Sequence, residues 1–338
     1  MANLSDTQLL AAIARASNQI QDSGEFRDYD HSAVKLLLMG ENDVFRDLNA
    51  MKQADSQPTK VDLNKKVYTA SGSAKSASHS AAAFPDSFVK DITYLRKTQT
   101  FKVSNKQADG NRLTYESILH YEMKNKLQSL YLDLSTEIVA WLNTNRTEVA
   151  TSSILTFDGV NFKFDNSLAD LNLFFEYLKS SMKKNKYNAT FDIAGDQRIA
   201  SLYRQLAANG RTNADNTEFQ LPGINLVEEP QMSIVDGGQC FAWQRGMVGM
   251  TTWNELLNRR GSGSVGNNEG LFTTMTDPIF GFELDLHVKR NIVDTSGAVG
   301  NVQDIVDEYE LAITYALEGT WESTADASHI FKFLQANS

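Results

Sequence analysis

The residues Glu283, Asp285 and His287 have types and a spacing that could bind a metal ion. They alternate with apolar residues in the segment FELDLHVKR, which is the pattern of a strand with one buried face. Their side chains would point to one face about 7 Å apart, and two carboxylates with an imidazole suit a divalent cation. Lys289 continues this face and would repel the cation. We therefore interpret the segment as the solvated outer face of a strand and predict no metal site.

A glycine-rich segment, Gly261–Gly266, has the three-glycine spacing of a dinucleotide-binding turn. That turn needs a strand before it and a helix after it, so that the pyrophosphate meets the N-terminus of the helix. The flanking sequences LLNRR and NNEG predict neither element. We expect a flexible surface loop and no cofactor.

The single cysteine, Cys240, lies in a strand pattern beside Phe241 and Trp243, without a base nearby in the sequence. We expect a small core residue and not a nucleophile. The remaining histidines lack metal-ligand spacing and are expected on the surface or hydrogen-bonded in a core: His31, His79, His120 and His329. The sequence has no nucleophile elbow and no phosphate loop. It therefore predicts no enzyme, with no catalytic, cofactor-binding or metal-binding residue.

Composition sets further limits on the class of protein. The 338 residues, 41% hydrophobic, suffice for two or three compact units. A formal net charge of −10 argues against a sequence-independent grip on nucleic acid, which needs Lys and Arg to displace counterions. One cysteine excludes an intrachain disulfide and favours a reducing compartment. The N-terminus lacks a basic leader and Arg15 interrupts its apolar portion, so we expect neither a secretion signal nor a membrane span.

The longest helical pattern runs from Tyr115 to Thr147 without Gly or Pro. Its apolar residues recur every three or four positions: Leu119, Met123, Leu127, Leu130, Leu134, Ile138 and Trp141. At about 1.5 Å per residue this helix would reach roughly 45 Å, whereas the mean helix has about 11–12 residues. We expect Thr114 to cap it, with Glu116 favourable in its first turn. Ile138 departs from a heptad, which disfavours a coiled coil.

The chain before this helix is poor in apolar residues. Two short amphipathic helices are predicted over residues 4–51, the first with Leu9, Leu10, Ile13 and Ile20, the second with Val34, Leu37 and Leu38 followed by Val44, Phe45 and Leu48. Thr69–Ala83 consists of small residues, which predicts a disordered linker or a loop that orders on a partner. Ile92 to Val103 predicts one long strand or two short ones, ended by a turn at Asp109-Gly110.

The chain after the long helix mixes helices and strands. We predict a hairpin turning at Asp158-Gly159, a helix opening at Ser167, a strand at 187–195 and a helix at 196–209 stopped by Gly210. Lys183–Lys186 is expected at the solvated end of a helix. Strand patterns then occupy 221–230, 239–253, 280–290 and 309–317.

This order of elements resembles the major capsid protein of tailed bacteriophages, which has the Hong Kong 97 fold. In that family a long spine helix follows the strand that returns from an extended loop, the E-loop, as the long helix follows TQTFKVSN here. LPGINLVEEPQMSIVDGGQCFAW resembles a phrase of the family's axial domain, and DPIFGFELDLHVKRN and DEYELAITYALEGT resemble the return to the peripheral domain. The resemblance covers about residues 60–320 and rests on the order of elements.

The resemblance implies an α+β, Hong Kong 97-type capsid fold in five parts. These are a helical N-terminal arm (1–58), the E-loop (59–97), a peripheral domain (98–189) with its spine helix (114–145), an axial domain (190–276) and a return to the peripheral domain (277–338).

The resemblance also implies a structural protein of the virion, assembled in the host cytoplasm. Its copies would form hexamers and pentamers of an icosahedral phage head around double-stranded DNA, touching the DNA only weakly and non-specifically, without a membrane. Scaffolding, portal or decoration proteins are further candidate partners. Shell contacts need arms that bury surface on a neighbour, and the small-residue loop is one candidate. We expect intersubunit contacts at Tyr68, Ser73, Lys75 and Phe84.

Three alternatives remain open at this point. The same fold could form an encapsulin-like nanocompartment, although the length of the arm and loops favours a phage shell. A soluble α/β enzyme could assemble distant residues, with Asp285 and His287 as its best candidates. The strand-rich C-terminal half would also suit a binding module such as a phage tail or adhesin component.

Overall fold

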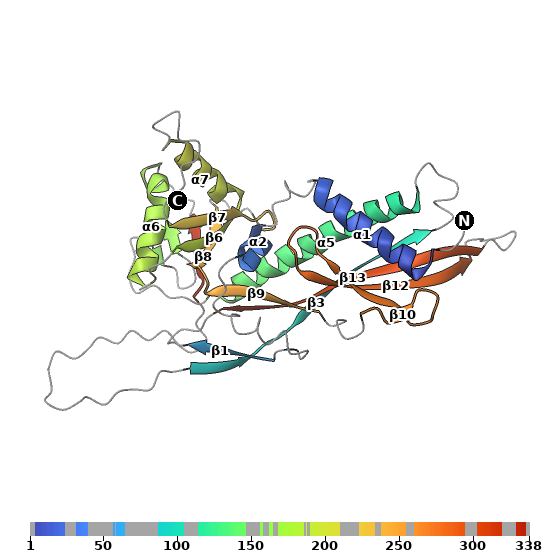
Figure 1. Cartoon of the computed structure of the whole chain (residues 1–338). Helices are drawn as coiled ribbons and strands as arrows, with labels where there is room; N and C mark the ends of the chain where they lie inside the picture. The colour runs from blue at the N-terminus through green and yellow to red at the C-terminus, as the bar shows by residue number, and fades with distance from the viewer. Residues whose placement is uncertain are drawn as a thin grey trace, which may run out of the picture. The chain divides into compact units, whose positions relative to one another are not determined.

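In the computed structural model of the chain, the residues described are 4–23, 32–39, 57, 59–64, 87–104, 114–146, 156–157, 162–164, 168–185, 187, 190–209, 223–233, 238–254, 260–294, 303–319 and 329–335. The helices are α1 (Asp6–Ser23), α2 (Ser32–Met39), α5 (Tyr115–Thr144), α6 (Leu168–Lys184) and α7 (Gln197–Asn209) (Figure 1). The strands are β1 (Lys60–Asn64), β2 (Ser87–Asp91), β3 (Leu95–Ser104), β4 (Thr156–Phe157), β5 (Phe162–Phe164), β6 (Phe191–Gly195), β7 (Ile224–Glu228), β8 (Gln239–Gln244), β9 (Val248–Trp253), β10 (Gly263–Ser264), β11 (Gly270–Thr276), β12 (Glu283–Asp294), β13 (Gln303–Gly319) and β14 (Phe331–Gln335).

The chain forms two compact units. Unit 1 comprises Met1–His31, Tyr94–Leu134 and Thr251–Ala316, and unit 2 comprises Ser32–Thr93, Ser135–Met250 and Leu317–Ser338. Boundaries fall inside α5, β9 and β13, so both units share these three elements of the chain.

Unit 1 contains an antiparallel sheet in the order β10-β11-β12-β13-β3, and β9 also pairs with β13. The register places Leu286 of β12 opposite Leu311 of β13, and both are 0% exposed. On the other side of β13, Tyr309 lies opposite Phe101 of β3, and the centroids of their stacked rings are 4.7 Å apart. Side chains alternate between the faces of a strand, so these residues form one continuous buried face.

Helix α5 packs on that face and has 30 residues, slightly fewer than the expected ranges 115–147 and 114–145. Thr114 is its N-cap, as predicted, because its Oγ1 accepts a hydrogen bond from Ser117 N at 3.3 Å. The predicted apolar stripe is 0% exposed at Leu119, Met123, Leu127, Leu130, Leu134 and Ile138. The prediction of Trp141 as the last residue of the stripe is wrong, because Trp141 is only partly buried and Leu142 is 0% exposed. The final step is therefore four residues, which keeps the stripe on one helix face.

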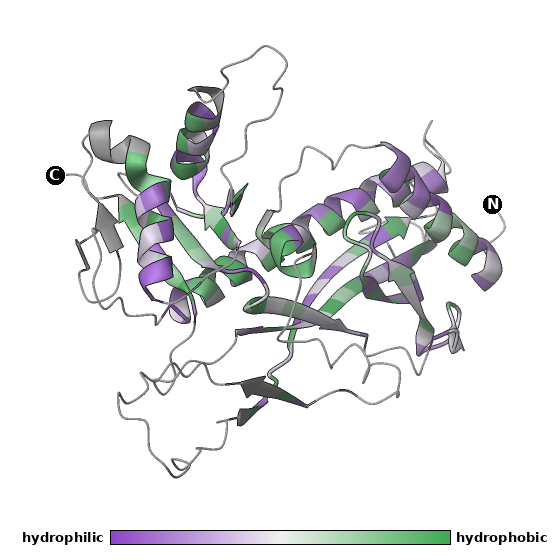
Figure 2. Cartoon of the chain, turned by 60° about the vertical axis from the view of Figure 1, so that its left-hand side comes forward, coloured by the Kyte–Doolittle hydropathy of each residue, from purple (hydrophilic) through white to green (hydrophobic). Residues whose placement is uncertain are grey.

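Helix α1 begins with a capping box that the sequence SDTQ encodes. Ser5 N donates to Gln8 Oε1 at 3.0 Å, and Gln8 N donates to Ser5 Oγ at 3.4 Å. Its buried residues are Leu9, Ala12, Ile13, Ala16 and Ile20. The predicted core residue Leu10 is only partly buried, because the small Ala12 and Ala16 belong to the buried stripe. Figure 2 shows such helices and strands banded in hydrophobic and hydrophilic residues.

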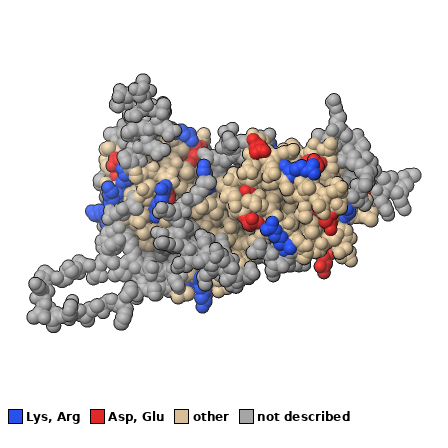
Figure 3. Space-filling view, viewed as in Figure 1, with Lys and Arg blue, Asp and Glu red and all other residues tan. Residues whose placement is uncertain are grey.

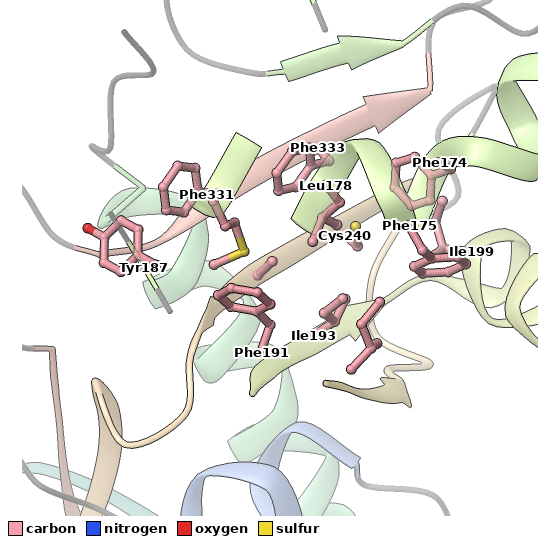
Figure 4. Packing of buried hydrophobic residues seen from close by; sticks show 13 residues of the cluster. Phe174, Phe175, Leu178, Tyr187, Phe191, Ile193, Ile199, Cys240, Phe331 and Phe333 are labelled. Atoms are coloured by element: carbon pink, nitrogen blue, oxygen red, sulfur yellow. The ribbon is translucent and has the colours of Figure 1, made fainter. Parts of the chain in front are cut away.

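Unit 2 contains a mixed sheet in the order β4-β5-β14-β8-β6-β7. The pairs β5–β14 and β6–β7 are parallel, and the other pairs are antiparallel. Helices α6 and α7 supply part of the core (Figure 4). The cluster comprises Phe174, Phe175, Leu178, Met182, Tyr187, Phe191, Ile193, Ile199, Ile224, Cys240, Ala242, Phe331 and Phe333. The helix and strand patterns of 167–209 and 239–253 predict most of these residues, whereas Phe331 and Phe333 lie on β14, a strand that the sequence analysis did not predict.

Helix α2 packs on β6 and β7 of the same unit. Val34 and Leu37 are buried as predicted, whereas Leu38 is partly buried. The buried Glu229 receives a hydrogen bond from Ala33 N at 3.0 Å, which places a carboxylate at the positive end of the helix. The predicted core residues Val44, Phe45 and Leu48 lie outside the described residues.

Three local predictions need correction or lie beyond the description. The segment Ile92–Val103, expected to form one long strand or two short ones, forms the single strand β3, which begins only at Leu95; β2 is a separate strand that ends at Asp91. The hairpin of β4 and β5 pairs Phe157 with Phe162, whereas a two-residue turn at Asp158-Gly159 would pair Phe157 with Val160; its register is therefore set by the strands and not by that turn signal. The turn predicted at Asp109-Gly110 lies outside the described residues.

Candidate assembly surface

The three residues that could have formed a metal site do not share a solvated face. Asp285 is 2% exposed, and its cross-strand neighbour Ala312 is 1% exposed, so the outer face of the sheet is covered at this point. The prediction of a solvated face is therefore wrong at Asp285, because tertiary packing covers both sides of the central strands. Within the described ranges, no group of three His, Cys, Asp or Glu residues could hold a metal ion.

His287 is held by the neighbouring strand and its turn. Its Nε2 atom forms a hydrogen bond with the backbone oxygen of Glu269 at 2.6 Å, and its ring stacks on Phe272 at 4.4 Å. The glycine-rich segment close by forms part of a hairpin, since Gly263 lies in β10. Gly263 has φ of 79°, and a Cβ there would collide with the carbonyl oxygen of Gly270. The expected flexible loop is thus wrong at β10, where strand pairing requires glycine.

Cys240 is 0% exposed within the unit 2 core, as predicted. Burial raises the pKa of its thiol well above the usual range, so it stays protonated. His329 is 1% exposed and its Nδ1 hydrogen-bonds with the Tyr187 hydroxyl, which makes it a satisfied core histidine. His120 is partly buried on α5, and Lys183 and Lys184 are exposed at the end of α6. His31 and His79 lie outside the described residues.

The predicted intersubunit contacts Tyr68, Ser73, Lys75 and Phe84 also lie outside the described residues. The structure does describe the two strands that flank their segment in the sequence. Strands β1 and β2 pair antiparallel from Lys60↔Asp91 to Asn64↔Ser87, so residues 65–86 connect the two strands at one end of the ribbon. Ile92 N extends the pairing by donating to Thr59 O at 2.8 Å.

The ribbon of β1 and β2 buries little of its surface. Among its described side chains Val61 is 5% exposed, whereas Lys60, Val89, Lys90 and Asp91 are exposed. No described strand pairs with either outer edge of the ribbon. A two-stranded ribbon is marginally stable alone, and open edges present backbone groups to which another chain can bind. The ribbon therefore has the properties of an arm.

An ion pair fixes the ribbon to the rest of unit 2. Lys90 Nζ lies 2.6 Å from Glu318 Oε2 at the end of β13. The Glu318 side chain is 7% exposed and that of Lys90 is 46% exposed. Burial raises the pKa of the Glu318 carboxyl, and the contact with Lys90 opposes that shift. The pair thus joins β2 of the ribbon to the end of β13.

The N-terminal segment is fixed to unit 1 by a buried charge pair. Arg290 donates to both carboxylate oxygens of Asp307, with Nε–Oδ1 at 2.7 Å and Nη2–Oδ2 at 3.0 Å. Its Nη1 atom donates to Leu4 O at 3.1 Å, and Val265 N donates to Asp6 Oδ1 at 3.1 Å. A bidentate Arg–carboxylate pair fixes the direction of the remaining guanidinium hydrogens. Through these two hydrogen bonds the sheet holds the chain in place where α1 begins.

Two phenols complete this charge cluster at the start of α5. The Tyr115 hydroxyl donates to Asp307 Oδ2 at 2.8 Å and lies 2.6 Å from the Tyr309 hydroxyl. Burial and the neighbouring carboxylate raise the pKa of Tyr115 far above its usual range, so it remains a neutral donor. The hydrogen bond with Asp307 raises the pKa of Arg290. The cluster joins the backbone at Leu4, the sheet and α5 within unit 1.

Sequence reasoning missed Arg290 and Asp307, although a signal was present. Arg290 follows Leu284, Leu286 and Val288 at the same strand parity, so it occupies an inward position. Asp307 likewise occupies an inward position, because it has the same strand parity as Tyr309 and Leu311. Opposite charges at inward positions of two strands indicate a buried pair once the strands are known to be neighbours. Lys90 and Glu318 gave no comparable signal.

Charges on the described surface are mixed in sign. On the face shown in Figure 3, Lys and Arg side chains are interspersed with Asp and Glu. In the described part of the chain, no helix is long and apolar enough to cross a membrane.

No family model matches the sequence, and no curated protein matches it. Solved structures do match the fold. A structure from Mycobacterium phage Che8 is 14% identical over 86% of this chain and 89% of its own, with a TM-score of 0.52. The capsid asymmetric unit of cyanophage A-1(L) is 11% identical over 90% of this chain and 92% of its own, with a TM-score of 0.50. The chain has the Hong Kong 97-type phage capsid fold.

The capsid fold agrees with the expected order of elements. The spine helix expected over 114–145 corresponds to α5, and the ribbon of β1 and β2 lies within the segment 59–97 expected to form the E-loop. The mixed α+β class is as predicted.

Proposed function

We propose that this chain is a phage major capsid protein, a structural protein without enzymatic activity. The observation that carries the proposal is the fold match to the cyanophage capsid asymmetric unit over 90% of the chain. Copies of the chain associate into hexamers and pentamers, and these close into an icosahedral head around double-stranded DNA. The protein is assembled in the host cytoplasm and ends in the virion.

The five parts of the fold take the roles that the resemblance implies. Residues 1–58 form the arm, 59–97 the E-loop, 98–189 and 277–338 the peripheral domain, and 190–276 the axial domain. The ribbon supports the role of the E-loop, because its exposed strands and open edges suit burial on a neighbouring copy. Intersubunit contacts of Tyr68, Ser73, Lys75 and Phe84 would repay the entropy of ordering this loop.

The charge of the chain suits a container for DNA. A net charge of −10 keeps the wall from binding packaged DNA tightly, so contact with the DNA is weak and non-specific. The mixed charges in Figure 3 agree with this, since a strong grip on phosphates needs a continuous basic face. Scaffolding, portal and decoration proteins are the further partners of such a shell.

The test is expression of the chain followed by negative-stain electron microscopy. We expect capsomers and closed shells. A chain that remains a monomer or small dimer at high concentration would overturn the proposal. DNA that resists nuclease inside particles purified from infected cells separates a phage head from a nanocompartment, which would enclose proteins instead.

A deletion of residues 69–83 tests the role of the loop. We expect the deletion to prevent closed shells while circular dichroism and the melting temperature show a folded chain. Leu173→Ala, which changes an exposed apolar residue on α6, is the matched control and should leave assembly unchanged. Normal shells from the deletion variant would show that residues 69–83 are not needed for assembly and would contradict the proposed role of the loop.

A further inference from the structure

Two cations share one neutral oxygen in the last turn of α5, in unit 2. Lys332 Nζ on β14 donates to Asn143 Oδ1 at 3.0 Å, and Arg146 Nη1 donates to the same oxygen. Two donors on one acceptor place the positive charges within about 6 Å of each other. Neither cation has a carboxylate partner in the described part of the chain. We call Lys332 and Arg146 the cation pair.

Two carbonyl groups near the end of α5 are satisfied without the cation pair. The carbonyl oxygen of Trp141 accepts hydrogen bonds from Asn145 N and Asn145 Nδ2, both at 2.9 Å. The carbonyl oxygen of Ala140 accepts one from Thr144 Oγ1 at 3.0 Å. The last turn of the helix has no basic residue. Cations near a helix end often serve its dipole, but here side chains of the helix end itself satisfy these carbonyl groups.

Lys332 is held in place by its surroundings. Its ammonium lies 5.3 Å from the centroid of the Phe241 ring on the neighbouring strand β8. Burial and the charge of Arg146 lower the pKa of Lys332 to about 8. The charged form still predominates at pH 7 but is less favourable than in water, and an anion between the two cations would reduce that penalty.

We propose that the cation pair binds a carboxylate of a second copy of this chain. The inference rests on the proposed shell function, which brings copies into contact. The planar guanidinium of Arg146 can bind a carboxylate with two hydrogen bonds, and Lys332 adds a point charge. A second copy is rich in carboxylates, with 42 Asp and Glu against 32 Lys and Arg. The resulting net charge of −10 disfavours DNA as the anion.

A zero-length carbodiimide cross-link identifies the carboxylate. The reagent activates a carboxyl group, the Lys332 amine attacks it to form an amide, and the reagent leaves as its urea. Shells are assembled from a mixture of ¹⁴N- and ¹⁵N-labelled chains, cross-linked and digested. We expect Lys332 peptides joined to acidic peptides of the other label. Cross-links confined to one label, or none at Lys332 while other lysines react, would overturn the inference.

Lys332→Met separates an intersubunit role from a role within the chain. It keeps the apolar stem and removes the charge; Lys183→Met, on an exposed lysine of α6, is the matched control. We expect the protein concentration at which shells form to rise about tenfold for Lys332→Met only. The melting temperature of the unassembled chain should not fall. A lower melting temperature with unchanged assembly would assign Lys332 to the helix end and overturn the inference.

Acetylation of Lys332 in intact shells distinguishes DNA from a second copy. We expect the rate at Lys332 to be at least about tenfold lower in shells than in unassembled chains, before and after DNA removal, with Lys183 reactive throughout. Protection that disappears when the DNA is removed would point to phosphate and contradict the inference. A wild-type chain without assemblies overturns both the proposed function and this inference, whereas normal assembly of Lys332→Met overturns the inference alone.

Discussion

Unit 1 and unit 2 bury different chemistry between helix and sheet. In unit 1 the buried groups include phenols and carboxylates: Tyr115, Tyr131, Asp277, Asp307 and Tyr309. The core cluster of unit 2 is built mainly from aromatic and aliphatic side chains, with Cys240 among them (Figure 4). Unit 2 also buries hydrogen-bonded carboxylates, at Asp192, Asp196 and Glu229, but they lie outside its apolar cluster.

The apolar core of unit 2 mainly contributes stability, whereas the polar core of unit 1 mainly positions its elements. Apolar burial stabilises unit 2 in proportion to the area removed from water and has little directional preference. The Arg290–Asp307 pair of unit 1 is directional and reaches Leu4 of the N-terminal segment. We infer that the polar core of unit 1 fixes one placement of the segment at Leu4, helix α5 and the sheet.

The largest effect is expected from a cavity in the core of unit 2. Phe331 packs between Tyr187, 5.4 Å away, and Phe333, 6.2 Å away. Phe331→Ala should cost about 4 kcal/mol of unfolding free energy, because both transfer and cavity terms are lost. Urea denaturation of the unassembled chain measures it. Phe331→Leu, which fills more of the volume, should cost less than half as much; equal losses would mean that this core is not closely packed.

A somewhat smaller effect is expected when the charge pair of unit 1 is broken. Arg290→Met leaves Asp307 buried without its counter-charge and should cost about 3 kcal/mol. Amide hydrogen exchange in α1 should also become faster, since Leu4 O loses its donor. The double variant Arg290→Met, Asp307→Leu should recover part of the stability but leave fast exchange in α1. A single variant as stable as the wild type would mean that the pair does not position the arm.

The smallest effect depends on pH and concerns Asp277 of unit 1. Its carboxylate accepts hydrogen bonds from Tyr131 Oη, Ile279 N and Phe280 N. Burial nevertheless raises its pKa from 3.8 to about 6. The unfolded chain then releases this proton at lower pH than the folded chain, so the folded state loses stability as pH rises from about 4 to about 6. The loss from this group is roughly 2–3 kcal/mol and persists at higher pH.

Asp277→Asn tests this titration, because the amide cannot ionise. The stability of the wild type relative to the variant should fall between pH 4 and pH 7, as measured by urea denaturation at each pH. Glu176→Gln, at an exposed site on α6, is the control and should show no such relative change. A constant difference between wild type and Asp277→Asn across this range would contradict the raised pKa.

Much of the fold follows from the sequence because its strongest signals are local. The stripe of α5, the Thr114 cap and the alternation around Leu286 depend on residues near each other in the chain. The hairpin register at Phe157 and the cover over Asp285 do not, since they depend on strands and segments brought together by the fold. Local patterns predicted the elements but not what covers them.

The candidate assembly surface was less predictable than the fold. The ion pair of Lys90 and Glu318 joins residues that are 228 positions apart, and that of Arg290 and Asp307 joins two strands whose pairing had to be known. A shell contact adds a further difficulty, because its partner residues belong to another copy. The expected contacts at Tyr68 and Phe84 therefore stay predictions.

The most direct test of the central claim is the mass of the particles that the purified chain forms. Sedimentation velocity over a hundredfold range of protein concentration should show a cooperative conversion from subunits or capsomers to a single very large species. The account predicts closed shells above a threshold concentration. A chain of 37.6 kDa that sediments as a monomer or small oligomer at every concentration would contradict it.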